Sequence, residues 1–342
     1  MQSPMKRNLV LLAVALLIAF GGYTYWQSTQ SLTKLTYPTA IGASAEIVIK
    51  IMKFYGIDRK HGLDVEPIAL NPTELERQEF SGELEGILIM SPLSAARLTL
   101  EGRPMKILAP LTYMPYSIAV RTDSSIATLS DLKGKKVGIL PKVVDAYKSI
   151  AIIFRSAGID PDRDLLSAYG SIPEMIALLA EGEVDATLVS YPGAAGLFAS
   201  GQYASIAKLE KLWETNEGGL PHPFIFHTVF ADWYEQPQNR DTARRFFDAY
   251  FETIELMRTR PEVMTEDTNP SIKEYLERNN LTSETAKQIV RNEMTAFLPV
   301  NWSDRDVVAI EHLFDIAEKF GYLPQSAPKD IIVSPSEFKA SL

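Results

Sequence analysis

Two stretches of the chain repeat one pattern of glycine, carboxylate and apolar residues. Residues 82–95 and 182–195 align without a gap, from Gly-Glu through an apolar run to X-Pro, with Ala three positions after the proline. A glycine suits the end of a helix, and a proline bars further sheet pairing. The pattern predicts two copies of one unit, with buried strands at 87–90 and 187–189 that stop at Ser91-Pro92 and Tyr191-Pro192.

Strand-like and helix-like patterns alternate along most of the chain, which predicts a mostly parallel sheet. Expected strands are 35–39, 62–66, 106–111, 116–121, 136–139 and 225–230, and expected helices are 45–60, 73–80, 145–157 and 173–180. Apolar residues at three- and four-residue spacing then predict helices at 241–259, 283–293 and 304–320. We expect these last helices to pack on the outside of the first lobe.

The length of 342 residues suits two lobes. A fresh strand–helix series starts after residue 130, and the strand at 225–230 is expected to return to the first lobe. The predicted boundaries are 34–117 plus 226–342 for the first lobe and 118–225 for the second. Residues 28–33 are expected to be a linker.

Residues 1–27 have the pattern of an export segment, with Lys6 and Arg7 followed by an aliphatic run from Leu9 to Phe20. This pattern is typical of a cleaved signal peptide. An uncleaved anchor over residues 8–26 is the alternative, because aromatic residues extend the uncharged stretch. Either way the charged end stays in the cytoplasm, so the rest is periplasmic, or faces the periplasm while tethered to the inner membrane.

Composition excludes several kinds of function. The formal net charge of -9 and the lack of a basic stripe argue against a nucleic-acid partner. The chain has no cysteine and four histidines, which removes thiolate chemistry and makes a metal site improbable. The apolar share of 46% and the charged share of 23% are those of a globular protein.

Signatures of catalysis are absent from the sequence. It contains no Gly-x-Ser-x-Gly elbow, no Walker A loop and no Gly-x-Gly-x-x-Gly after a strand. The carboxylate pairs Glu83/Glu85 and Glu183/Asp185 flank turns before buried strands, where a solvated role is the better interpretation. We therefore predict no catalytic residue, no metal and no cofactor.

Candidate binding residues follow from the rule that ligands bind at the carboxyl ends of strands in open α/β sheets. The loops at those ends supply apolar, aromatic and hydroxyl side chains, as small-molecule pockets do. Lys142 precedes a predicted helix start, where it either adds charge to an anion site or points to solvent. The predicted ligand-binding residues are Tyr37, Thr39, Ile41, Ser91, Pro92, Tyr113, Met114, Lys142, Val143, Tyr191 and His222.

Three of these residues also have a structural interpretation. Tyr37 and Tyr191 either stack on a flat ligand or fill the core, and His222 either orients a ligand carboxylate or stiffens a proline-rich crossover.

Residues 130–139, 155–160, 180–186 with Pro192, and 53–66 together resemble the solute-binding proteins of ABC importers. The resemblance covers about residues 34 to 230 and is closest to the nitrate, sulfonate, taurine and thiamine-precursor binders. It implies an α/β fold of the two-lobe periplasmic-binding-protein type II. In that fold each lobe is a mostly parallel sheet flanked by helices, and two crossover strands let the lobes close on a solute.

The sequence departs from these relatives after the strand at 136–139. Family members commonly place Gly and Ser or Thr there to bind an anion, whereas this chain has Pro141 and Lys142 followed by two valines. The first repeat also reads Leu-Glu-Gly where the family usually has Val-Asp-Ala. Both departures favour a larger, partly aromatic or heterocyclic solute over nitrate or a sulfonate.

We expect an exported, monomeric solute-binding protein that delivers a small organic molecule to an ABC permease in the inner membrane, without bond chemistry. One alternative is a ligand-sensing receptor subunit tethered to the membrane. The other is a biosynthetic enzyme on the same fold, although enzymes of this type that make the thiamine pyrimidine resemble a cysteine-containing pattern that this chain lacks.

Overall fold

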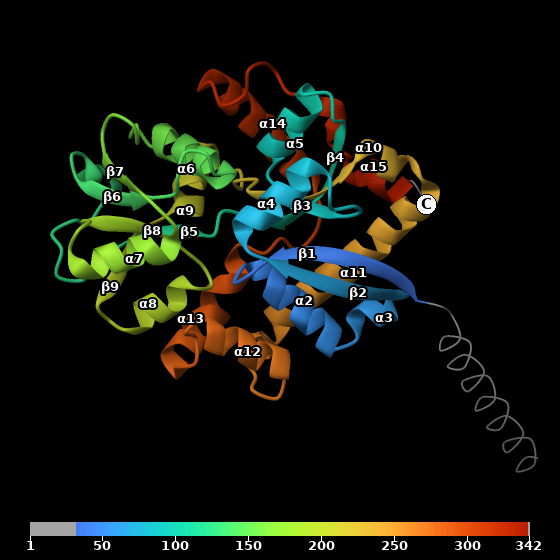
Figure 1. The fold of residues 1–342 in the computed structure, drawn as a ribbon, viewed down its shortest axis with the longest axis horizontal. Helices are drawn as coiled ribbons and strands as arrows, with labels where there is room; N and C mark the ends of the chain where they lie inside the picture. The colour runs from blue at the N-terminus through green and yellow to red at the C-terminus, as the bar shows by residue number, and fades with distance from the viewer. Residues whose placement is uncertain (1–31, 341–342) are drawn as a thin grey trace, which may run out of the picture.

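The computed structural model describes residues 32–340, whose strands form three sheets. Strand β1 (Thr33–Ala40) pairs in parallel with β2 (Leu63–Leu70). In the second sheet β10 (Ile225–Phe230) lies between β3 (Leu88–Met90) and β4 (Met105–Thr112) and is antiparallel to both. We call the part of the molecule built on these two sheets the first lobe (Figure 1).

The third sheet, with its helices, is the second lobe. Its strand order is β7 (Leu166–Tyr169), β6 (Lys136–Ile139), β8 (Ala186–Ser190), β5 (Tyr116–Arg121) and β9 (Tyr203–Lys208). Strand β6 is parallel to its two neighbours, whereas β5 is antiparallel to both of its own. The β1–β2 sheet is parallel, but the other two sheets are not mostly parallel as predicted. The reason is that β5 and β10, each of which enters a lobe after the chain has crossed, run antiparallel to the strands beside them.

The helix predicted at 45–60 is two helices, α2 (Ser44–Phe54) and α3 (Ile57–Lys60). Gly56 separates them with a φ of 65°, a left-handed conformation that ends the regular hydrogen bonding of α2. The other helices over the described residues are α4 (Pro72–Ser81), α5 (Pro92–Leu100), α6 (Asp145–Ser156), α7 (Ile172–Glu181), α8 (Ala194–Ala199), α9 (Leu209–Asn216), α10 (Ala231–Glu235), α11 (Pro237–Thr259), α12 (Pro270–Arg278), α13 (Glu284–Glu293), α14 (Asp304–Lys319) and α15 (Pro335–Ala340).

The two repeat copies are equivalent at their start and differ at their end. Gly82 and Gly182 both adopt left-handed conformations that end α4 and α7, as the sequence pattern predicts. Beyond the strands, Ser91 caps α5 directly, whereas the Tyr191-Pro192 peptide is cis and α8 begins only at Ala194. The copies therefore present different groups at the ends of β3 and β8.

The helices of the last third of the chain do more than cover the first lobe. Helix α13 packs against α8 of the second lobe, and Gly196 of α8 lies against the turn between α12 and α13. In Figure 1 these orange helices lie below both lobes. The expectation of packing only on the outside of the first lobe is thus wrong for α13, which also contacts the second lobe through α8.

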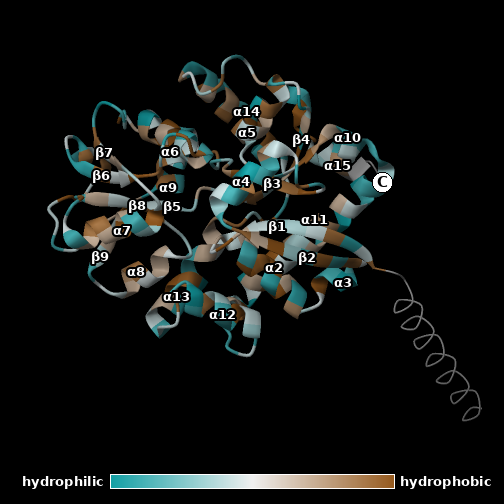
Figure 2. Cartoon of the chain, viewed as in Figure 1, coloured by the Kyte–Doolittle hydropathy of each residue, from teal (hydrophilic) through white to brown (hydrophobic). Residues whose placement is uncertain are grey.

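One apolar core runs through the described residues of both lobes. Its largest aromatic cluster is on α11, where Phe246, Phe247 and Tyr250 surround the His227 ring of β10. Polar residues cover the outside, and α4 is almost entirely hydrophilic in Figure 2. Within residues 32–340 no helix is both long and apolar enough to cross a bilayer. The predicted export or anchor segment, residues 1–27, lies outside the described residues.

Candidate functional site

The lobes meet where two helices begin. Ser91 is the N-cap of α5 in the first lobe, and its hydroxyl oxygen accepts the Ser94 backbone N–H at 3.1 Å. The same hydroxyl donates to Asp145, the first residue of α6 in the second lobe. Lys148 binds the other oxygen of Asp145 at 3.1 Å. A carboxylate of the protein thus lies between two helix N-termini, which is where an anionic group is most favoured.

A second carboxylate, that of Glu76 on α4, lies close to Asp145. Burial raises the pKa of Glu76, and the charge of Asp145 raises it further. A carboxylate also lies at the start of α2. Glu46 accepts the Gly42 backbone N–H at 2.8 Å and pairs with Arg278. Carboxylates of the protein therefore already lie in the first turns of α6 and α2.

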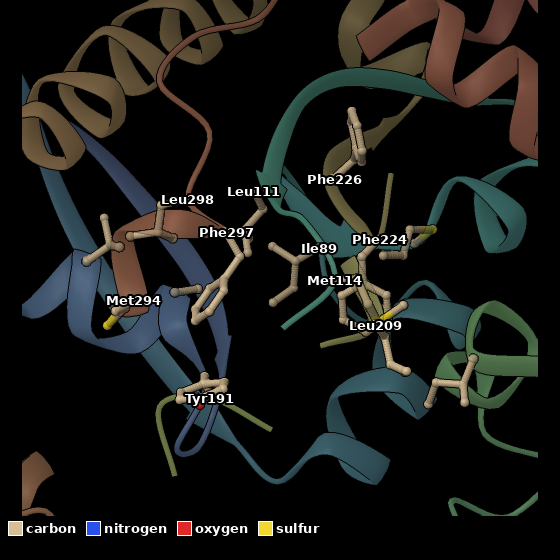
Figure 3. Close-up of a cluster of buried hydrophobic side chains, with 14 of the residues drawn as sticks. Ile89, Leu111, Met114, Tyr191, Leu209, Phe224, Phe226, Met294, Phe297 and Leu298 are labelled. Atoms are coloured by element: carbon tan, nitrogen blue, oxygen red, sulfur yellow. The ribbon is translucent and has the colours of Figure 1, made fainter. Parts of the chain in front are cut away.

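Aromatic side chains form the apolar part of the junction. The Tyr191 ring, after β8, lies 5.6 Å between centroids from the ring of Phe297, in the segment before α14. In Figure 3 the two rings lie one above the other, with Ile89 and Met114 across from Phe297. Burial, followed by the charge of Glu293, raises the pKa of Tyr191 to about 12. Tyr191 is therefore a neutral aromatic wall at neutral pH.

The segments that connect the lobes are joined by Glu210, near the start of α9. Its two carboxylate oxygens accept the backbone N–H groups of Met114 and His222, each at 3.0 Å. Burial raises the pKa of Glu210 to about 8, against the effect of these two hydrogen bonds. His222 is fully buried against Trp213, and burial lowers its pKa to about 3, so its ring is neutral.

The other predicted residues differ in how far their side chains are buried. Tyr37 is in the core of the first lobe and hydrogen bonds to His227 at 2.8 Å. Thr39 is also buried, whereas Ile41 is 44% exposed. The Tyr113 hydroxyl donates to Asp306 at 2.7 Å, and burial raises its pKa well above the usual range.

Lys142 and Val143 lie at the rim of the second lobe. Lys142 pairs with Asp162 and lies over the Tyr169 ring, which agrees with the solvent-facing interpretation rather than with a charge on an anion. Val143 is 88% exposed. The structure therefore brings together Ser91, Pro92, Met114 and Tyr191 at the junction and leaves Lys142 and Val143 outside it.

Sequence reasoning missed four residues of the junction, Glu76, Asp145, Glu210 and Phe297. Asp145 carried a signal, since it follows a strand and opens a helix. Glu210 also opens a helix, but nothing local in the sequence links it to Met114 or His222. Phe297 stands in an irregular segment with no periodicity to place it.

Two open hollows of about 500 and 480 Å³ lie elsewhere on the described surface. The first lies between the ends of α6 and α14 and is lined by Arg155, Asp160, Arg163 and Lys319 among others. The second lies along β1 and is lined partly by residues 83–86. We place the candidate site at the junction instead, because both repeat units and both lobes supply residues there. Within residues 32–340 no three His, Asp or Glu side chains are grouped to hold a metal ion.

Comparison with known proteins identifies the fold. The sequence model of the periplasmic substrate-binding protein of phosphonate ABC transporters matches residues 74–229. The periplasmic aliphatic sulphonate binding protein SsuA from Escherichia coli has 15% identity and a TM-score of 0.63, with 88% of this chain and 91% of that chain covered. No curated protein matches the sequence.

Two further solved structures agree. The alkanesulfonate-binding protein SsuA from Xanthomonas axonopodis pv. citri, bound to MOPS, has 17% identity, a TM-score of 0.62, and coverage of 88% of this chain and 98% of its own. The nitrate-binding protein NrtA from Synechocystis PCC 6803 has 15% identity, a TM-score of 0.55, and coverage of 91% and 85%.

The fold is therefore that of periplasmic binding proteins, and the α/β two-lobe fold predicted from the sequence is confirmed. Residues 74–229 match the model of an ABC-type substrate-binding protein, which agrees with the resemblance stated from the sequence. At 13–17% identity the solved structures establish the fold and leave the solute open.

Proposed function

We propose that this protein is exported, captures a small organic molecule between its lobes and delivers it as a monomer to an ABC permease. The observation that carries the proposal is the meeting of α5 and α6, one from each lobe, at Ser91 and Asp145. A solute that binds better to the closed arrangement shifts the protein toward that arrangement. The protein binds the solute and its lobes close on it, without bond chemistry. The lobes turn at the boundaries predicted near residues 117 and 225.

We propose a solute without an oxyanion group. Asp145 and Glu46 carry negative charge at the starts of α6 and α2, so an anionic solute has to compete with them. Tyr191, Phe297 and Met114 offer apolar and aromatic area instead. These features support a larger, partly aromatic or heterocyclic molecule, which the sequence departure at Pro141 also favours.

Mass spectrometry of the protein purified from its own periplasmic or membrane fraction tests the function. Native spectra are expected to show an added small mass, and denaturation is expected to release that molecule unchanged. Release of a chemically altered molecule would instead support an enzyme. A released sulfonate, phosphonate or nitrate would contradict the proposed ligand class while leaving solute binding intact.

The same spectra distinguish the soluble binder from a tethered receptor subunit. The aliphatic run from Leu9 to Phe20 supports either a cleaved leader or an anchor. A mass that lacks about the first 27 residues agrees with a free periplasmic binder. A mass that retains them agrees with the receptor.

A further inference from the structure

The chain passes between the lobes twice, and both connections are poor in hydrogen-bond donors. The first, residues 113–115, joins β4 to β5, and the second, residues 217–224, joins α9 to β10. Pro115, Pro221 and Pro223 have no backbone N–H. Met114 and His222 thus supply the donors beside these prolines, and both residues are buried.

One side chain satisfies both donors. The Oε2 atom of Glu210 accepts from Met114 and its Oε1 atom accepts from His222, each at 3.0 Å. Because a carboxyl group has one oxygen for each of two converging N–H groups, it suits this arrangement, whereas a carboxamide has only one oxygen. The preceding residue, Leu209, is fully buried and holds the start of α9 in the second lobe.

No other side chain among the described residues hydrogen bonds to both connections. The Tyr113 N–H binds the carbonyl of Phe297 in the first lobe, and the carbonyl of Pro115 accepts from Tyr191 in the second. Each of these bonds holds one connection to one lobe. Among the described residues Glu210 is the side chain that hydrogen bonds to both connections, so movement of either connection relative to α9 must change one of its bonds.

We propose that Glu210 is the positioning residue of lobe closure, a clamp that makes the two connections turn as one hinge. The proposal rests on closure as the proposed mode of solute binding. Without the clamp each connection samples backbone conformations independently, and the lobes adopt a broader range of orientations. With it the free protein is already restricted to the path that leads to closure.

The test measures the distance between the lobes in solute-free protein, so that its result does not depend on solute binding. The chain has no cysteine, so cysteines at the exposed positions Glu101 and Lys133 give one label on each lobe. In this labelled background Glu210→Gln is expected to broaden the distance distribution obtained by pulsed electron paramagnetic resonance. Glu214→Gln, on the same helix but paired with Lys211, is the matched control and is expected to leave it narrow.

Hydrogen exchange of the unsubstituted protein keeps the proposal testable if Glu210→Gln does not fold. The Met114 and His222 amides are expected to be protected to a similar degree, because one carboxylate holds both. In Glu210→Gln at least one of them should exchange about tenfold faster or more, since one of the two buried N–H groups loses its acceptor. Rapid exchange of either amide in the unsubstituted protein, or equal broadening by Glu210→Gln and Glu214→Gln, would overturn the proposal.

Discussion

The rings of Tyr191 and Phe297, from opposite lobes, lie 5.6 Å apart between centroids and 36° from parallel. Tyr191 lies in the second copy of the repeat, at the position where the first copy has Ser91. The aromatic contact therefore forms on one side of the junction and the Ser91–Asp145 hydrogen bond on the other. In the proposed function, Tyr191 and Phe297 would offer the solute aromatic area, and Ser91 and Asp145 would offer polar groups.

Replacing Tyr191 by alanine is expected to weaken solute binding by on the order of 1 to 3 kcal/mol, through lost aromatic burial. The measurement is the thermal shift produced by the molecule released from the native protein. Tyr169→Ala is the control, because Tyr169 is 43% exposed at the rim of the second lobe. An unchanged shift in Tyr191→Ala would remove Tyr191 from the site.

Ser91 and Asp145 are expected to be energetically coupled. Ser91→Ala removes both the α5 cap, worth about 1 kcal/mol, and the hydrogen bond between the lobes. A double-mutant cycle with Asp145→Asn, measured by urea unfolding, should give a coupling energy of about 0.5 kcal/mol or more. Ser171→Ala is the matched control, since Ser171 caps α7 within the second lobe. Additive effects of Ser91→Ala and Asp145→Asn would mean that the contact contributes nothing.

Gly196→Ala is expected to disturb the contact between α8 and the turn before α13. A Cβ atom at position 196 would lie 2.7 Å from the carbonyl oxygen of Asn280, so one lobe must shift from the other. The cost should be roughly 1 to 3 kcal/mol in urea unfolding, with a larger radius of gyration in solution scattering. Gly193→Ala is the control, because its nearest contact would be at 3.5 Å. Equal effects of the two substitutions would contradict this close approach.

Stability is expected to fall as the pH drops below about 6.5, partly because His227 is buried. Burial lowers the pKa of His227 from 6.5 to about 3. Between these values the unfolded chain binds a proton that the folded protein does not, which costs up to about 1.4 kcal/mol per pH unit. Urea unfolding of His227→Asn should therefore have a shallower dependence on pH from 6 to 4. An identical slope would mean that the folded protein protonates this ring.

The fold was predictable to a large extent because its signals are local. The glycines at 82 and 182, the capping box of Ser303 and Asp306, and the apolar spacing of α11 are each read within a few residues. Strands were harder, since β7 and β9 are short edge strands with few buried residues and were not predicted. The break at Gly56 was also missed, because apolar residues continue at helical spacing on both sides of it.

The candidate site was predictable only in its position at the strand ends. Ser91 and Tyr191 were identified from the repeat, and the structure places both at the junction. Tyr37 shows the limit of the same reasoning, since a tyrosine at a strand end can equally be turned into the core, where it binds His227. No feature of the local sequence pattern distinguishes these two directions.

By itself the sequence determined the units of this protein: two related supersecondary copies, helix ends set by glycine, and an α/β alternation that resembles solute-binding proteins. Tertiary structure alone decided which residues meet. Ser91 reaches Asp145 across 54 positions, and Glu210 reaches Met114 across 96 positions. The physical reason is that periodicity fixes which face of an element is buried. Sheet order and the two passages between the lobes fix what that face is buried against.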